Sequence, residues 1–215
     1  MNKKPYVIGL DLGGTNSVFG IVDKDAKIVK SVSIPTTGHG TAEKYVKACV
    51  DALNPLIAEV GGIEKIKAMG IGAPNGNYYS GCIEDAPNLE WRGNIPLVKM
   101  FQEALGIPVV LTNDANAAAI GEMAYGAARG MKNFIEITLG TGVGGGIILD
   151  GGDTETLTDG NNKADNSEDK DTLCSLLLCC FTCSFSLFSS CLVLEINSKT
   201  IIKFCQLISR ILIIP

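Results

Sequence analysis

Two glycine-rich segments of similar design constrain the fold of this chain more than any other feature. Residues 11–16 read DLGGTN, residues 139–146 read LGTGVGGG, and each segment lies between two apolar runs rich in β-branched residues. Apolar runs separated by a short glycine-rich segment predict a β-hairpin. Because glycine permits positive φ angles and lets an anion approach several backbone N–H groups at once, both hairpin tips are candidate polyphosphate-binding loops.

Other glycine-rich motifs fit these segments less well. A Walker loop has a lysine after its last glycine and continues into a helix, and neither segment has these features. Residues 140–145 match the G-x-G-x-x-G spacing of a dinucleotide-binding loop, but that loop opens a helix, whereas residues 147–149 continue as a strand. An ordinary hairpin turn remains an alternative for either segment taken alone.

A carboxylate between the two loops supplies a candidate catalytic group. Residues 107–112 predict a buried strand, and residues 115–129 predict a small-residue helix closed by Gly130. Asp114 then lies at a strand-to-helix corner, where it can accept a proton from a substrate hydroxyl that Asn113 orients. The alternative is that one of these two residues is simply the helix N-cap. Two phosphate loops and a base together predict a phosphotransferase.

The order of several motifs resembles one protein family. The chain between residues 6 and 152 is similar to the amino-terminal lobe of the ROK family of sugar kinases and repressors, and most closely to its bacterial-type glucokinases. The motifs that carry the resemblance are DLGGTN (11–16), GIGAPNG (70–76), PNLEW (87–91), NDANAAAIGE (113–122) and LGTGVGGG (139–146). Such an ordered set is far more specific than any one motif.

The resemblance also implies a fold class. A third strand at residues 27–34, an amphipathic helix at about 41–60 and a strand at 66–71 complete the pattern of an α/β, ribonuclease H-like lobe, as in actin, Hsp70 and sugar kinases. Such enzymes bind their substrates between two lobes, which close to exclude water. The family's second lobe, with its Glu-x-Gly-His segment, has no counterpart after residue 152, so we expect it to be largely missing.

The resemblance implies an ATP-dependent hexose kinase of carbohydrate metabolism and glycolysis, which phosphorylates the sugar 6-hydroxyl and uses Mg²⁺. Glucose is the favoured sugar. The alternatives are a related kinase for fructose, mannose or an N-acetylhexosamine, and a truncated, non-catalytic fragment. Asp114 is implied as the catalytic base and Asp11 as the magnesium ligand. The implied sugar contacts are Gly72, Asn88, Asn113 and Asp114. The implied ATP phosphate contacts are Asp11, Gly13, Gly14, Thr15, Asn16, Thr141, Gly142 and Gly144.

The composition changes abruptly after residue 152, the predicted end of the first domain. Residues 153–171 are polar and acidic, which predicts a disordered linker. Residues 172–215 form an apolar tail rich in cysteine and serine, and the sudden change favours translation out of frame, an unspliced insert or a premature end over an evolved extension. A membrane anchor is not favoured, because no basic cluster or aromatic belt marks an interface. Cys180 and Cys183 have no second ligand pair, so the zinc site of the family is not supported here.

The net charge and the number of cysteines limit which partners and which cellular compartment the sequence predicts. The formal net charge is −5 and basic residues are not clustered, so no nucleic-acid partner is predicted. Residues 1–152 contain only two cysteines, Cys49 and Cys82, which favours the reducing cytoplasm. The predicted partners are the hexose and ATP, and homo-oligomer formation is left open. Three other side chains are assigned structural positions: His39 in a solvated loop, Trp91 half-buried in a loop, and Glu122 on a solvated helix face.

Overall fold

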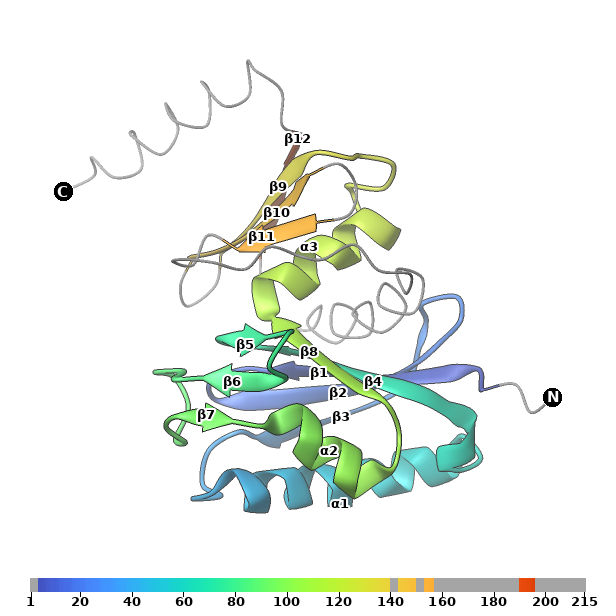
Figure 1. Cartoon of the computed structure of the whole chain (residues 1–215). Helices are drawn as coiled ribbons and strands as arrows, with labels where there is room; N and C mark the ends of the chain where they lie inside the picture. The colour runs from blue at the N-terminus through green and yellow to red at the C-terminus, as the bar shows by residue number, and fades with distance from the viewer. Residues whose placement is uncertain (1–3, 140–142, 150–152, 157–189, 196–215) are drawn as a thin grey trace.

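The computed structural model describes residues 4–139, 143–149, 153–156 and 190–195 (Figure 1). Its main sheet has five strands in the order β3-β2-β1-β4-β8. The strands are β1 (Tyr6–Leu12), β2 (Asn16–Asp23), β3 (Ile28–Pro35), β4 (Ile66–Ala73) and β8 (Val109–Asn113). The first three are antiparallel neighbours, whereas β1, β4 and β8 run parallel. This arrangement is the ribonuclease H-like lobe predicted from the sequence.

Helices cover both faces of the main sheet. Figure 1 shows α1 (Ala42–Glu59) and α2 (Leu97–Leu105) together on one side and α3 (Asp114–Tyr125) on the other. The predicted amphipathic helix at 41–60 is confirmed as α1, and Thr41 caps it by accepting a hydrogen bond from the Lys44 N–H. A short 3-10 helix, η1 (Ile63–Lys65), leads from α1 into β4.

A second sheet carries the other predicted hairpin. Its strand order is β11-β10-β9-β12, and all neighbours are antiparallel. The strands are β9 (Phe134–Leu139), β10 (Val143–Leu149), β11 (Asp153–Thr156) and β12 (Ser190–Glu195). The predicted linker at 153–171 thus begins with a strand, and the predicted tail at 172–215 contains one; the remainder of both segments lies outside the described residues. A small third sheet consists of β5 (Gly76–Asn77), β6 (Cys82–Glu84) and β7 (Asn94–Ile95).

The buried apolar side chains form two clusters. The larger cluster fills the space between the main sheet and helices α1 and α2, and it includes Ile8, Leu10, Phe19, Ile21, Tyr45, Leu53, Met69, Ile71 and Phe101. The smaller cluster joins α3 to the second sheet and consists of Ala119, Ile120, Ala128, Phe134 and Ile148. Helix α3 therefore contacts both sheets.

Helix α3 is shorter than predicted. It ends at Tyr125 with Gly126 as its C-cap, instead of continuing to residue 129. The reason is the side chain of Glu122, which is buried and accepts a hydrogen bond of 2.6 Å from the Ala127 N–H just beyond the helix. The expected position of Glu122 on a solvated face is therefore wrong. Trp91 is also more buried than predicted, at 6% exposure.

Within the described residues, every helix is too short or too polar to traverse a lipid bilayer.

Candidate functional site

The register of the parallel strands brings several predicted site residues to one edge of the main sheet. Asp11 on β1 pairs with Gly72 on β4, and Gly72 pairs with Thr112 on β8. One position further along, Ala73 pairs with Asn113. Because parallel strands have their carboxyl ends at the same edge, Asp11, Gly72 and the residues that follow β8 share one end of the sheet.

Asp114 is the first residue of α3 and lies directly beyond that edge. Its Oδ1 accepts a hydrogen bond of 2.8 Å from the Ala115 N–H. The same N–H group lies 3.0 Å from Oδ1 of Asn113, the N-cap residue of the helix. The N-cap interpretation is therefore correct for Asn113. These contacts fix both side chains at the corner between strand and helix, the position predicted for them from the sequence.

The first glycine loop is the tip of the hairpin between β1 and β2, as predicted. Its glycines are required by close approach and not by positive φ angles, which neither Gly13 nor Gly14 adopts. A Cβ atom on Gly13 would lie 2.9 Å from the Asn16 carbonyl oxygen. A Cβ atom on Gly14 would lie 3.3 Å from both the Cβ and the carbonyl oxygen of Asn88. The first glycine loop thus lies against Asn88, a predicted sugar contact.

A buried set of hydroxyl groups lies beneath this loop, and the sequence did not reveal it. The Ser17 Oγ is 2.7 Å from the Thr36 Oγ1 and 2.7 Å from the Tyr45 hydroxyl oxygen. Thr36 donates a hydrogen bond of 2.8 Å from Oγ1 to the Gly13 carbonyl. Its backbone N–H donates another, also 2.8 Å, to the Thr15 carbonyl. All three side chains are almost completely buried.

Burial strongly raises the pKa of the Tyr45 hydroxyl, and the nearby Cys49 thiol and Asp11 carboxylate raise it further. Tyr45 therefore stays protonated and can donate a hydrogen bond at any pH the protein meets. Ser17 before the apolar run of β2 was the only sequence signal, because Thr36 and Tyr45 stand among other polar residues.

The loop at residues 36–40 joins this hydroxyl set to the PNLEW segment. The Glu90 carboxylate accepts hydrogen bonds from the Gly38 N–H at 2.8 Å and from the Gly40 N–H at 3.4 Å. These bonds, the first above all, lower the pKa of Glu90. Trp91 packs on Tyr45 with ring centroids 4.6 Å apart, and the ring of His39 makes an edge contact with Tyr45 at 5.6 Å. His39 is thus half-buried and not simply solvated.

The second glycine loop is described only in part. Thr141 and Gly142 lie outside the described residues, so their predicted phosphate contacts stay predictions. Gly144 lies within β10, paired with Thr138 of β9, and not in the hairpin tip itself.

Among the described residues, no group of three or more His, Cys, Asp or Glu side chains is placed to hold a metal ion. A magnesium ion bound with a nucleotide does not need such a group, since it is held by one or two carboxylates together with phosphate oxygens and water. The single carboxylate of Asp11 at the sheet edge fits this kind of binding.

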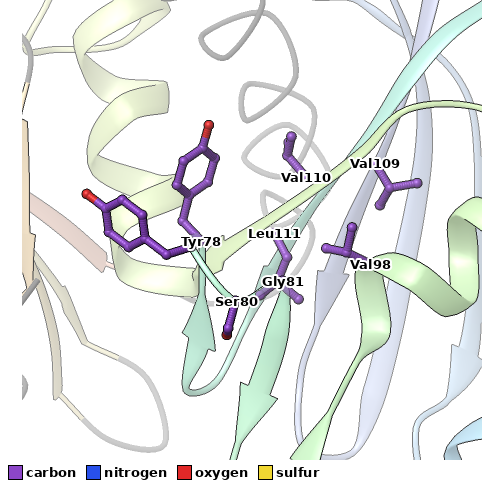
Figure 2. Close-up of a pocket in the computed structure, with 8 residues that line it drawn as sticks. Tyr78, Ser80, Gly81, Val98, Val109, Val110 and Leu111 are labelled. Carbon is purple, nitrogen blue, oxygen red and sulfur yellow. The ribbon is translucent and has the colours of Figure 1, made fainter. Parts of the chain in front are cut away.

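A surface hollow of about 360 Å³ lies elsewhere on the lobe (Figure 2). Its lining residues are Tyr78, Tyr79, Ser80, Gly81, Val98, Val109, Val110 and Leu111. None of them is a predicted site residue, although Val109, Val110 and Leu111 belong to β8, the strand that ends at Asn113.

Comparison with known proteins gives a consistent result. Residues 7–157 match the family model described as the ROK family. The chain is 43% identical over 143 residues to a glucokinase of Streptomyces coelicolor, covering 66% of this chain and 43% of that protein. It is 32% identical over 146 residues to a fructokinase of Lactococcus lactis, covering 68% of this chain and 47% of that protein.

The fold has close counterparts among solved structures. A ROK family glucokinase from Streptomyces griseus, solved in complex with glucose and AMPPNP, is similar with a TM-score of 0.58 and 38% identity. The match covers 71% of this chain and 48% of the other. The chain therefore spans about half the length of the relatives it matches.

Proposed function

The chain belongs to the ROK family, and we propose on this basis that it carries the phosphate loop, sugar contacts and catalytic base of an ATP-dependent hexose kinase. The reaction transfers the terminal phosphoryl group of ATP to the 6-hydroxyl of the sugar. Glucose is the preferred sugar in this proposal. It has the support of higher identity to the glucokinase of Streptomyces coelicolor, 43%, than to the fructokinase of Lactococcus lactis, 32%. The related kinases of other hexoses are the second candidate.

The observation that carries the proposal is the row of Asp11, Gly72 and Thr112 across the sheet, with Asp114 at the helix N-terminus beside it. Phosphoryl transfer to a hydroxyl needs an anion-binding loop and a proton acceptor close together, and the shared edge supports the proposal that the first glycine loop and Asp114 fill these two roles. The transition state of such a transfer is loose, so catalysis comes chiefly from positioning and from charge stabilisation.

In this mechanism Asn113 and Asn88 orient the sugar, and Asp114 accepts the proton of the 6-hydroxyl as that oxygen attacks. The N–H groups of the loop at residues 14–16 are proposed to face the nucleotide phosphates, whereas the Gly13 N–H donates its hydrogen bond to the Asn16 carbonyl. Asp11 would hold Mg²⁺ together with phosphate oxygens, and the bound ion supplies positive charge next to the transferred group. Thr141, Gly142 and Gly144 are proposed to contact the phosphates from the second loop. We further propose that the enzyme acts in the cytoplasm.

The test is a coupled assay of ATP turnover by the purified chain, with glucose, fructose, mannose and N-acetylhexosamines as substrates. Asp114→Asn should reduce kcat by about a hundred- to ten-thousand-fold, the usual contribution of a general base, while glucose binding persists. Asp25→Asn is the matched control, because Asp25 lies in the β2–β3 turn with a side chain 71% exposed. It should leave kcat unchanged.

Three outcomes would each contradict a part of the proposal. Equal turnover by the wild type and Asp114→Asn would remove Asp114 as the base. Glucose and ATP binding without any turnover by the wild type would instead support the alternative of a non-catalytic fragment. Faster turnover of fructose or an N-acetylhexosamine would replace glucose by the second candidate.

A further inference from the structure

We propose that Tyr45, Ser17 and Thr36 are positioning residues for phosphate binding, which orient the first glycine loop through a buried, one-directional chain of hydroxyl groups. The inference rests on the proposed function, since it assumes that residues 13–16 receive a polyphosphate. It adds three residues that touch neither substrate and lie outside the motifs DLGGTN, PNLEW and NDANAAAIGE.

The direction of the chain follows from counting protons. Each hydroxyl group has one hydrogen to donate. Thr36 donates its hydrogen to the Gly13 carbonyl, which can only accept. The 2.7 Å contact between Thr36 and Ser17 must then use the hydrogen of Ser17, and the 2.7 Å contact between Ser17 and Tyr45 must use that of Tyr45. The chain therefore runs from Tyr45 through Ser17 and Thr36 to the Gly13 carbonyl.

The loop needs such a chain because its carbonyl groups would repel a phosphate. Thr36 binds two of them, the Gly13 carbonyl through its hydroxyl and the Thr15 carbonyl through its backbone N–H. In a trans peptide the C=O of one residue and the N–H of the next point in opposite directions. No peptide bond in the described residues is cis. Holding the Gly13 carbonyl against Thr36 therefore turns the Gly14 N–H toward the opposite side, where an anion can approach.

Burial makes this arrangement stiff. Ser17 and Tyr45 are fully buried and Thr36 is 2% exposed, so water cannot replace a lost donor without entering the core. Hydrogen bonds in a chain of this kind strengthen one another, and removing one donor leaves a buried acceptor without a partner. A defect at Tyr45 should therefore be felt at Gly13, although two other side chains lie between them.

The experiment compares Thr36→Val and Tyr45→Phe with Thr37→Val. The first two variants remove a hydroxyl of the chain with little change in shape, and the third makes the same Thr-to-Val change at the exposed neighbouring residue. All use the full chain. The readouts are KM for ATP, KM for glucose, kcat, and the Kd for inorganic triphosphate with Mg²⁺ by calorimetry. A thermal unfolding scan confirms that each variant is folded.

We expect Thr36→Val and Tyr45→Phe to raise the KM for ATP and the Kd for triphosphate by about tenfold, the size of one net hydrogen bond. The KM for glucose should change by less than about twofold, and Thr37→Val should resemble the wild type. A merely structural defect would lower the melting temperature and change the KM for ATP and the KM for glucose to a similar extent.

Several results would overturn the inference. If Thr36→Val and Tyr45→Phe both bind triphosphate with the same Kd as Thr37→Val, the hydroxyl groups do not orient the loop. Equal changes in the KM for ATP and the KM for glucose would also overturn the inference. If the wild type binds triphosphate but shows no turnover, the proposed function fails while the calorimetric comparison still decides the inference. If the wild type binds no triphosphate, the inference fails as well. Should Thr36→Val not fold, Tyr45→Phe and Ser17→Ala carry the test.

Discussion

Replacing Gly146 with alanine should damage the contact between α3 and the second sheet. Gly146 is buried in β10, where a Cβ atom would lie 2.6 Å from the Cβ of Ala119 and 2.8 Å from the carbonyl oxygen of Ala115. Both neighbours belong to α3, and neither is the flexible end of a long side chain. The helix must therefore move away from the strand to accept the new methyl group.

The expected size follows from two opposing effects. Overpacking a tight core costs about 1–3 kcal/mol, and alanine in a strand is more favourable than glycine by about 0.5–1 kcal/mol. The adjacent Gly145 isolates the first effect, because a Cβ atom there would meet only the Glu136 carbonyl oxygen at 3.6 Å, an ordinary contact. Gly145→Ala should thus be neutral or slightly stabilising. Gly146→Ala should be less stable than Gly145→Ala by about 1–3 kcal/mol.

Urea unfolding of both variants, followed by circular dichroism, measures this difference from the two midpoints at a common slope. The same shift of α3 displaces Asp114 at its first turn, so Gly146→Ala should also lose turnover where Gly145→Ala does not. Equal unfolding midpoints for the two alanine variants would refute the packing argument. If Gly145→Ala loses as much stability as Gly146→Ala, substitutions in β10 are harmful whatever the new side chain contacts.

Two further predictions use the titrating groups. The N–H groups of Gly38 and Gly40 lower the pKa of Glu90 in the folded protein. The ionised Glu90 side chain therefore stabilises the fold fully at a pH above the ordinary glutamate pKa, and this contribution is lost as the pH falls through the pKa of Glu90 in the folded protein. The melting temperature of Glu90→Gln should therefore lie below that of the wild type at pH 7 and converge with it below about pH 4, whereas the exposed control Glu103→Gln should show no such convergence. Burial raises the pKa of the Cys49 thiol to about 12, so iodoacetamide at pH 8 should modify Cys82 in the folded chain and leave Cys49 intact; peptide mass spectrometry showing equal modification before unfolding would contradict this.

The elements that the sequence predicted well are those specified by local pattern. Both hairpins follow from apolar runs around glycine, and α1 follows from its amphipathic period and its Thr41 cap. The strand-to-helix corner at Asn113 is equally local, since the cap hydrogen bond spans only two residues. Short-range signals of this kind do not depend on the rest of the fold.

The features that the sequence did not reveal depend on contacts between distant segments. Ser17 and Tyr45 are 28 residues apart, and Glu90 is 52 residues from Gly38. No periodicity marks such pairs, because a serine in a strand or a glutamate in a loop is usually solvated. The role of Gly14 was misjudged for the same reason: its φ angle is ordinary, and the constraint comes from Asn88, which only the fold brings near.

The order of the motifs along the chain can now be explained by the topology of the lobe. After the antiparallel strands β2 and β3, the chain adds β4 parallel to β1 and then β8 parallel to β4, so the carboxyl ends of β1, β4 and β8 lie at the same edge of the sheet. Residues placed just at those ends meet there whatever lies between them in sequence. The second hairpin belongs to another sheet and cannot use this register. Its connection to the edge is α3, which begins with Asp114 and packs through Ala115 and Ala119 onto Gly146. The same helix therefore sets the position of the proposed base and its distance from the second loop, which is why a single methyl group at residue 146 should affect both stability and turnover.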